Sequence, residues 1–134
     1  MIGVLVVTHG SIGEALVSSA AQILGSSPQQ VATLSVWRQD DPDDLVLRAR
    51  ELLDGLDAGD GVLVLTDIFG ATPGNVVSRL LQDGKVEGVS GVSLPMLLRV
   101  VTSRNGSLRA AVQRAMSGGA EGVVHMNRDR CCDA

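Results

Sequence analysis

Aromatic residues are almost missing from this sequence of 134 residues, in which they make up 1% of the chain. Tyrosine does not occur, and Trp37 and Phe69 are the single tryptophan and the single phenylalanine. Any core must therefore be built from aliphatic side chains, which supply most of the 45% hydrophobic fraction. With only 19% charged residues, the composition excludes a disordered chain and favours one folded domain over residues 1–134.

Cysteine is also scarce, because the only two, Cys131 and Cys132, are neighbours at the end of the chain. Adjacent cysteines are poorly placed for a structural disulfide and do not have the spacing of a zinc site. We interpret them as exposed thiols of a tail, residues 128–134, that we expect to be disordered. This cysteine usage favours a reducing, cytoplasmic location, and the sequence predicts neither a metal nor a cofactor.

The sequence has neither a cluster of basic residues nor a long apolar run. Its net charge of −4 argues against nucleic acid as a partner. No apolar stretch reaches the roughly 18 residues of a membrane-spanning helix. The first residues lack the charged flank and cleavage site of a signal peptide. We therefore expect no membrane insertion.

Short apolar runs alternate with segments of helical periodicity along the chain. The runs typical of buried strands cover residues 2–7, 31–37, 62–66 and 86–92. The last predicted helix ends at Gly118-Gly119 and is followed by a short fifth strand over residues 122–126. This alternation predicts an α/β fold with a mainly parallel, doubly wound sheet in the strand order 2-1-3-4.

Helix boundaries are predicted from capping residues. Ser11 and Glu14 have the spacing of a capping box, and Gly25 would end the helix that they begin. The apolar residues spaced to face the core in this helix are Ile12, Leu16, Ile23 and Leu24. The expected N-caps of later helices are Asp41, Thr72 and Ser107, and Gly84 is the expected end of the helix that Thr72 begins.

Two polar residues follow neighbouring strands of the predicted sheet, His9 after the first and Asp67 after the third. Ligands of open α/β sheets bind at the carboxyl ends of such strands, so we expect the two side chains to meet. The carboxylate would accept the proton of one ring nitrogen and leave the other free to attack. Beside them, Gly70, Ala71 and Thr72 lead into a helix whose first N–H groups suit a phosphoryl group.

These groups are typical of a phosphohistidine carrier, because phosphoryl transfer needs mainly positioning and charge stabilisation. The chain has no Walker motif, which argues against a nucleotide-dependent kinase. Each residue also has a simpler interpretation, as a loop residue, a turn glycine or a helix cap. The convergence of all of them on one edge of the sheet favours the functional interpretation. His125, in the predicted last strand, is interpreted as a surface or interface residue.

The sequence resembles the IIA domain of the mannose-type sugar phosphotransferase system over nearly its whole length. The segments that carry the resemblance are 7–10 (VTHG), 66–75 (TDIFGATPGN) and 91–97 (GVSLPML). The resemblance implies that the histidine phosphocarrier protein phosphorylates His9, which passes the group to a IIB-type acceptor. It implies that Asp67 orients His9 and that the loop from Gly70 to Thr72 lies by the phosphate. It also implies a homodimer in which the last strand crosses to the partner's sheet.

The sequence departs from this family in two ways. Phe69 stands where the best-known members have tryptophan, so the partner-binding surface is expected to differ. Phe69, Trp37 and Arg38 are the candidates for that surface, with packing for Trp37 and solubility for Arg38 as the alternative interpretations. No linker or IIB domain follows, so we expect a stand-alone carrier that serves sugar uptake or regulation.

Three alternatives remain open from the sequence. A phosphocarrier subunit related to dihydroxyacetone kinase has the same fold and an early histidine, but the Gly-Ala-Thr-Pro loop fits the mannose type better. Small tetrapyrrole metal chelatases also begin with a strand that leads to His-Gly-Ser. They need further metal-handling groups, and His125 is the only other histidine. The third alternative is a regulatory module that phosphorylation of His9 switches.

Overall fold

The structure is a computed structural model that describes residues 1–128. Cys131 and Cys132, like all of the predicted tail beyond residue 128, lie outside the described residues. Strands and helices alternate as the sequence predicts. In chain order the elements are β1 (Gly3–His9), α1 (Ile12–Leu24), β2 (Val31–Val36), α2 (Pro42–Leu56), β3 (Val62–Thr66), α3 (Thr72–Ser78), β4 (Val86–Ser90), α4 (Leu94–Val101) and α5 (Leu108–Glu121).

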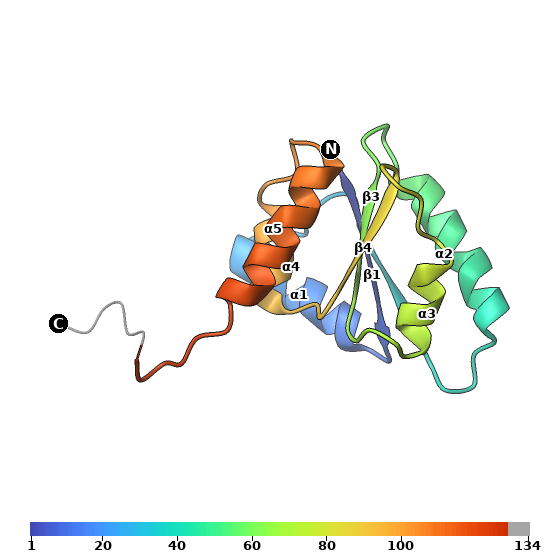
Figure 1. Cartoon of the computed structure of the whole chain (residues 1–134), viewed down its shortest axis with the longest axis horizontal. Coiled ribbons are helices and arrows are strands. Elements are labelled where there is room, and N and C mark those ends of the chain that lie inside the picture. Colours follow the sequence, from blue (N-terminus) through green and yellow to red (C-terminus); the bar gives the residue numbers. More distant parts are fainter. Residues whose placement is uncertain (129–134) are drawn as a thin grey trace.

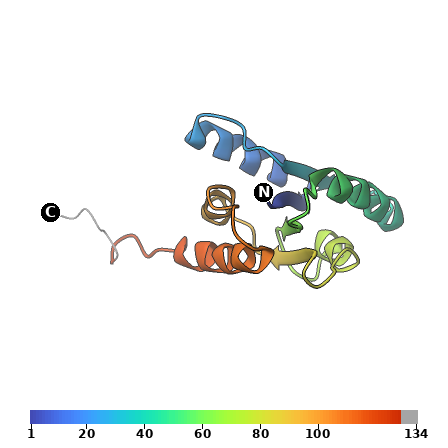
Figure 2. The same ribbon diagram turned by 90° about the horizontal axis from the view of Figure 1, so that it is seen from above.

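The four strands form one sheet in the order β2-β1-β3-β4, and every neighbouring pair is parallel. In the register of this sheet, Val7 of β1 pairs with Leu34 of β2 on one side and with Thr66 of β3 on the other. Helices α1, α4 and α5 cover one face, and α2 and α3 cover the other (Figures 1 and 2). The predicted strand order is confirmed, and the switch point lies between the carboxyl ends of β1 and β3.

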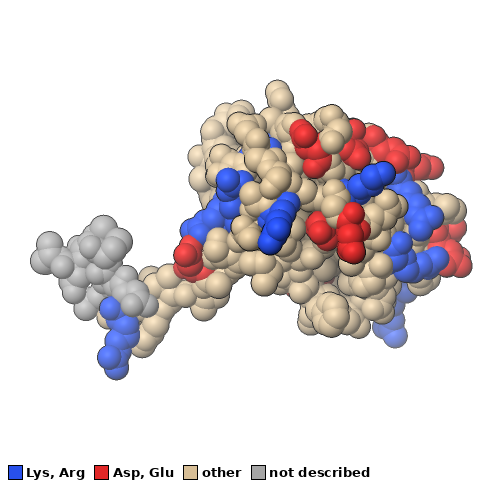
Figure 3. All heavy atoms as spheres, turned by 45° about the horizontal axis from the view of Figure 1, so that its top comes forward, with Lys and Arg blue, Asp and Glu red and all other residues tan. Residues whose placement is uncertain are grey.

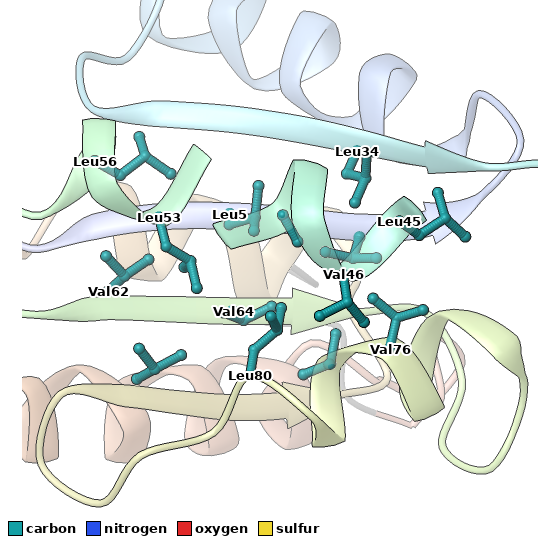
Figure 4. Packing of buried hydrophobic residues seen from close by; sticks show 14 of the residues in the cluster. Leu5, Leu34, Leu45, Val46, Leu53, Leu56, Val62, Val64, Val76 and Leu80 are labelled. Carbon is teal, nitrogen blue, oxygen red and sulfur yellow. The ribbon is translucent and has the colours of Figure 1, made fainter. Parts of the chain in front are cut away.

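Two aliphatic clusters form the core, one on each face of the sheet. Leu5 of β1 belongs to the cluster under α2 and α3, together with Leu45 of α2 (Figure 4). Val4 of β1 belongs to the opposite cluster, together with Leu97 of α4. Every residue of β1 is buried except its last, His9. The strand is therefore covered on both faces, as its continuous apolar run predicts, and its burial ends at the histidine.

Several predicted helix boundaries are confirmed by side-chain hydrogen bonds. Asp41 begins α2, where its carboxylate accepts a hydrogen bond from the N–H of Asp43. Ser107 begins α5, where its hydroxyl oxygen accepts one from Ala110. Gly25 ends α1 with a left-handed φ of 82°. Such caps satisfy backbone groups that have no partner inside the helix.

The C-terminal part of the chain differs from the prediction, because α5 does not end at Gly118-Gly119 but continues to Glu121. Glycine weakens a helix, but here its small size permits close packing on α4. A Cβ added to Gly118 would lie 3.1 Å from Cβ of Arg99, and one added to Gly122 would lie 2.6 Å from Cβ of Pro95. Packing between helices therefore outweighs the local preference of the glycines.

Residues 122–128 form no strand in the single chain, although the sequence predicts one over residues 122–126. A strand requires a hydrogen-bonded neighbour, and this segment leads away from the sheet, with Val123 and Met126 exposed (Figure 1). The exchange of this strand between two copies therefore stays a prediction. The fourth strand is also shorter than expected, because it ends at Ser90.

Acidic and basic side chains are interspersed over the face of the molecule seen in Figure 3. Of the helices in residues 1–128, none is long and apolar enough to cross a membrane.

Candidate functional site

The site is built on the carboxyl ends of β1 and β3, where the structure brings His9 and Asp67 together. The Nδ1 atom of His9 lies 2.8 Å from Oδ2 of Asp67. The same oxygen accepts a hydrogen bond of 3.0 Å from the backbone N–H of His9. The other carboxylate oxygen, Oδ1, accepts one of 3.0 Å from the N–H of Ile68. The carboxylate therefore holds both the backbone and the ring of the histidine.

The hydrogen bond determines which ring nitrogen can react. An ionised carboxylate only accepts hydrogen bonds. Nδ1 of His9 therefore carries the ring proton and donates a hydrogen bond to Asp67. In the neutral ring, Nε2 then keeps its lone pair. The His9 side chain is 48% exposed, whereas that of Asp67 is 15% exposed. A partner can reach the imidazole, while the carboxylate that orients it is largely covered.

The electrostatics of Asp67 support this assignment. Desolvation by partial burial acts to raise the pKa of Asp67, but the hydrogen bonds and the charge interaction from His9 outweigh it. The N–H of Ile68 acts in the same direction as His9. The pKa of Asp67 therefore lies below its ordinary value of 3.8, and the side chain is ionised at neutral pH.

The loop from Gly70 to Thr72 follows directly from this pair and leads into α3. Within residues 1–128, the N–H groups of Gly70, Ala71 and Thr72 donate no hydrogen bond. Gly70 has a left-handed φ of 89°, which glycine adopts without strain. These unused donors are what an anion requires. Because α3 has only seven residues, the attraction of an anion to this loop would come from the N–H groups more than from a helix dipole.

The prediction that Thr72 caps this helix is wrong. The N-cap is Ala71, which is extended (φ −95°, ψ 177°), and Thr72 is the first helical residue. The helix begins one residue earlier than predicted, and Pro73 is tolerated at its second position because the N–H groups of the first turn have no partner inside the helix. The helix also ends at Ser78, well before Gly84.

The three candidate partner-binding residues are all exposed. Phe69 is 80% exposed in the loop after Asp67, and Trp37 is 51% exposed after β2. Trp37 is held in a turn in which its N–H donates to Asp40, and its indole lies against Gly10. At this degree of exposure neither aromatic side chain is part of the core, so the packing interpretation of Trp37 is wrong. Arg38 follows Trp37 and is also exposed.

The structure adds two apolar residues near this edge that sequence analysis did not identify as part of a surface. Ile68 is exposed between Asp67 and Phe69, and Ile12 is exposed in the first turn of α1. The prediction that Ile12, Ile23 and Leu24 face the core is wrong, because all three are exposed. The sequence did contain one signal for an exposed apolar residue at the site, because Ile68 directly follows the site residue Asp67.

The remaining histidine does not join the site. His125 lies in the exposed segment after α5. Within residues 1–128, no group of three or more His, Cys, Asp or Glu side chains is arranged to hold a metal ion.

Comparison with known proteins assigns the family. The family model for the PTS system fructose IIA component, EIIA-man, matches residues 3–116. The chain belongs to the EIIA-man family.

Its relatives include the PTS system mannose-specific EIIAB component of Escherichia coli K12, which is 31% identical over 125 residues. That alignment covers 91% of this chain but 38% of the E. coli protein, so the chain spans less than half of that relative. The PTS system fructose-specific EIIA component of Bacillus subtilis is 30% identical, over 78% of this chain and 71% of that protein.

Among solved structures, the phosphotransferase system component EIIA of Streptococcus agalactiae superposes with a TM-score of 0.85 at 28% identity. The match covers 96% of this chain and 99% of that one. This chain and the solved EIIA component therefore have the same fold.

Proposed function

We propose that this protein is a cytoplasmic phosphohistidine carrier of a sugar phosphotransferase system. The observation that carries the proposal is the 2.8 Å contact between Nδ1 of His9 and Asp67, which leaves Nε2 as the nucleophile. Membership of the EIIA-man family supplies the class of reaction. The proposed donor is the phosphorylated histidine phosphocarrier protein.

In the first step, the lone pair of Nε2 attacks the phosphorus of the donor's phosphohistidine. The new P–N bond forms as the donor's P–N bond breaks, and the donor's imidazole leaves with the electron pair of that bond. The His9 ring then carries positive charge while Nδ1 keeps its proton, and the Asp67 carboxylate stabilises that charge. The N–H groups of Gly70, Ala71 and Thr72 are proposed to bind the phosphoryl oxygens.

In the second step, a nucleophile of a IIB-type acceptor attacks the phosphorus, and His9 leaves as neutral imidazole. The exposed side chains of Phe69, Ile68, Ile12 and Trp37 are proposed to form the docking surface for both partners, with Arg38 at its border. Apolar side chains that are exposed around a reactive group favour docking of a protein partner. A IIB component of a mannose- or fructose-specific system is the first acceptor to test.

We also propose that two copies of the chain form a homodimer by exchanging residues 122–126. β4 is an edge strand of the sheet, and its outer side is available to a further strand beyond Val86, which already pairs with Gln82. Val123, Val124 and Met126 are exposed in the single chain and would be buried by such an exchange.

The experiment that tests the carrier function is phosphorylation in a reconstituted system. The purified protein is incubated with phosphoenolpyruvate, enzyme I and the histidine phosphocarrier protein, and intact-protein mass spectrometry counts the phosphoryl groups. We expect one group per chain, labile in acid and stable in base. His9→Ala should abolish it, and His125→Ala, the matched control, should not. Stoichiometric phosphorylation of His9→Ala would disprove the assignment of His9.

A further inference from the structure

The residue that precedes His9 is a buried threonine whose side chain bonds across the loop between β1 and α1. We call this loop, Gly10 and Ser11, the site loop. Thr8 is fully buried in β1. Its Oγ1 accepts a buried hydrogen bond of 2.8 Å from the N–H of Gly13. Gly13 is the second residue of α1, so this single bond spans the complete connection between β1 and α1. His9, Gly10, Ser11 and Ile12 lie between its two ends.

This hydrogen bond takes the place of the capping box that the sequence predicts. Ser11 is the N-cap of α1, but it has φ −93° and ψ 12° and makes no side-chain capping bond. Glu14 also does not cap the helix, because its carboxylate accepts a hydrogen bond from Ser35 of β2. One of the first N–H groups of α1, that of Gly13, is satisfied instead by the side chain of Thr8.

The backbone of the site loop is held on three sides. The N–H of His9 donates to Asp67 after β3, and the N–H of Gly10 donates to the carbonyl oxygen of Val36 in β2. Both bonds tie the loop to neighbouring strands. Among the hydrogen bonds of residues 1–128, only the one from Gly13 to Thr8 ties the start of α1 to β1 across the loop.

The contact between Thr8 and α1 is tight as well as hydrogen-bonded. A Cβ added to Gly13 would lie 3.1 Å from Oγ1 of Thr8 and 3.2 Å from Cγ1 of Val6. A side chain at this position would therefore crowd the strand, and the hydrogen bond opposes movement of the helix away from it. The hydrogen bond thus limits the distance that the four residues between Thr8 and Gly13 bridge.

We propose that Thr8 is a positioning residue for His9. Its hydroxyl oxygen fixes the first turn of α1 and, through the short loop, keeps the His9 ring directed at Asp67. The inference rests on the proposed function only in that phosphoryl transfer is one of its two readouts. The rate of a reaction falls steeply when the reactive group moves by a fraction of an ångström to about one ångström.

The structure offers a matched control in a second buried threonine. Thr66 directly precedes Asp67, as Thr8 precedes His9, and it is 3% exposed. In contrast to Thr8, Oγ1 of Thr66 has no hydrogen-bond partner among the described residues. Replacing either threonine with valine keeps the shape and removes the hydroxyl, but only at Thr8 does this break a bond.

The experiment compares Thr8→Val, Thr8→Ser and Thr66→Val with the wild-type protein. We expect Thr8→Val to lower the rate of phosphoryl acceptance from the phosphocarrier by about 10- to 100-fold. Thr8→Ser keeps the acceptor oxygen and should restore most of that rate, although it loses a buried methyl group. Thr66→Val should accept the group at the wild-type rate. Equal rates for Thr8→Val and the wild type would overturn the inference, as would failure of Thr8→Ser to restore the rate.

The second readout is the ¹⁵N NMR spectrum of the His9 ring, which reports the tautomer without any transfer reaction. We expect a single tautomer with the proton on Nδ1 in the wild type and in Thr66→Val, and a mixture in Thr8→Val. A purely structural role would lower the melting temperature of Thr8→Val and leave the ring spectrum unchanged, which would contradict the proposal. If the wild type accepts no phosphoryl group, the proposed function fails, and the ring spectra still decide the role of Thr8.

Gly13→Ala is the second variant, used if Thr8→Val does not fold. Its added methyl group would lie 3.1 Å from Oγ1 of Thr8, so strand and helix must separate slightly. Alanine is favoured over glycine in a helix, so the fold should be retained. We expect slower phosphoryl acceptance and an altered ring spectrum. A wild-type rate and a wild-type spectrum in this variant would refute the proposal.

Discussion

The substitution Asp67→Asn tests how the carboxylate acts on His9. Oδ2 of Asp67 accepts two hydrogen bonds from His9, at 2.8 and 3.0 Å, and Oδ1 accepts one from Ile68 at 3.0 Å. Asparagine has a single acceptor oxygen. If this oxygen replaces Oδ2, two hydrogen bonds remain, whereas the opposite orientation keeps only one. We therefore expect the amide oxygen to face His9 and the tautomer of the ring to be preserved.

The variant then loses the negative charge beside a ring that becomes positive during the reaction. Hydrogen bonds to charged groups are about twice as strong as neutral ones, a difference of about 1–1.5 kcal/mol. This difference corresponds to a rate of phosphoryl acceptance about tenfold lower than in the wild type. Asp67→Ala removes the acceptor altogether and releases the ring, so its rate should fall by about 100-fold.

The assay is rapid-quench measurement of phosphoryl transfer from the labelled phosphocarrier to an excess of each variant. The matched control is Asp43→Asn, because Asp43 also forms an ion pair, with Arg79, but is 77% exposed. Exposed pairs contribute little, so this control should transfer at the wild-type rate. A wild-type rate for Asp67→Asn would refute the role of charge, and a rate below that of Asp67→Ala would refute the predicted amide orientation.

Three further predictions follow from the same structure. Because the pKa of Asp67 is lowered below 3.8 in the folded state, its contribution to stability is present above that pH and is lost as the pH falls through the folded-state pKa. The unfolding free energy of Asp67→Asn should be lower than that of the wild type by about 1–3 kcal/mol at pH 7. Urea titrations should show that this difference in unfolding free energy disappears below pH 4. A difference that persists at lower pH would contradict the lowered pKa of Asp67. Phe69→Ala should raise the KM for the phosphocarrier about tenfold without altering the melting temperature, and Ile23→Ala, at the far end of α1, should change neither. Sedimentation should find a dimer for the intact chain and a folded monomer for a chain cut after Gly122, which keeps α5 complete; a monomeric intact chain at micromolar concentration would rule out the dimer.

The sheet and the pair at its edge could be predicted because their signals are local and strong. The apolar run of β1 leads directly to His9, and β3 leads to Asp67 in the same way. Parallel strands with a switch point between them then bring the two residues to one place, whatever the details of the helices.

The errors lie where contacts between two secondary-structure elements decide the local structure. Gly118 and Gly119 are helix breakers by propensity, but they fit against Arg99 and Met96 of α4. Ser11 has the sequence of a cap, but a threonine three residues earlier already supplies the acceptor to Gly13. The fit of the glycines depends on which helices become neighbours in the fold, and the hydrogen bond depends on the turn that brings the start of α1 back onto the end of β1.

The contact of Gly122 with Pro95 has a practical consequence for labelling. Pro95 stands at the start of α4, which follows the carboxyl end of β4. The chain therefore leaves α5 near the same end of the strands as His9. The amino group of Met1 pairs with Asp60 at the opposite edge. The seven residues of β1 separate the two edges by roughly 20 Å. A dye or a surface anchor joined at the amino end would therefore lie at the end of the strands opposite to the histidine, whereas one joined just after α5 would lie at the same end as the histidine.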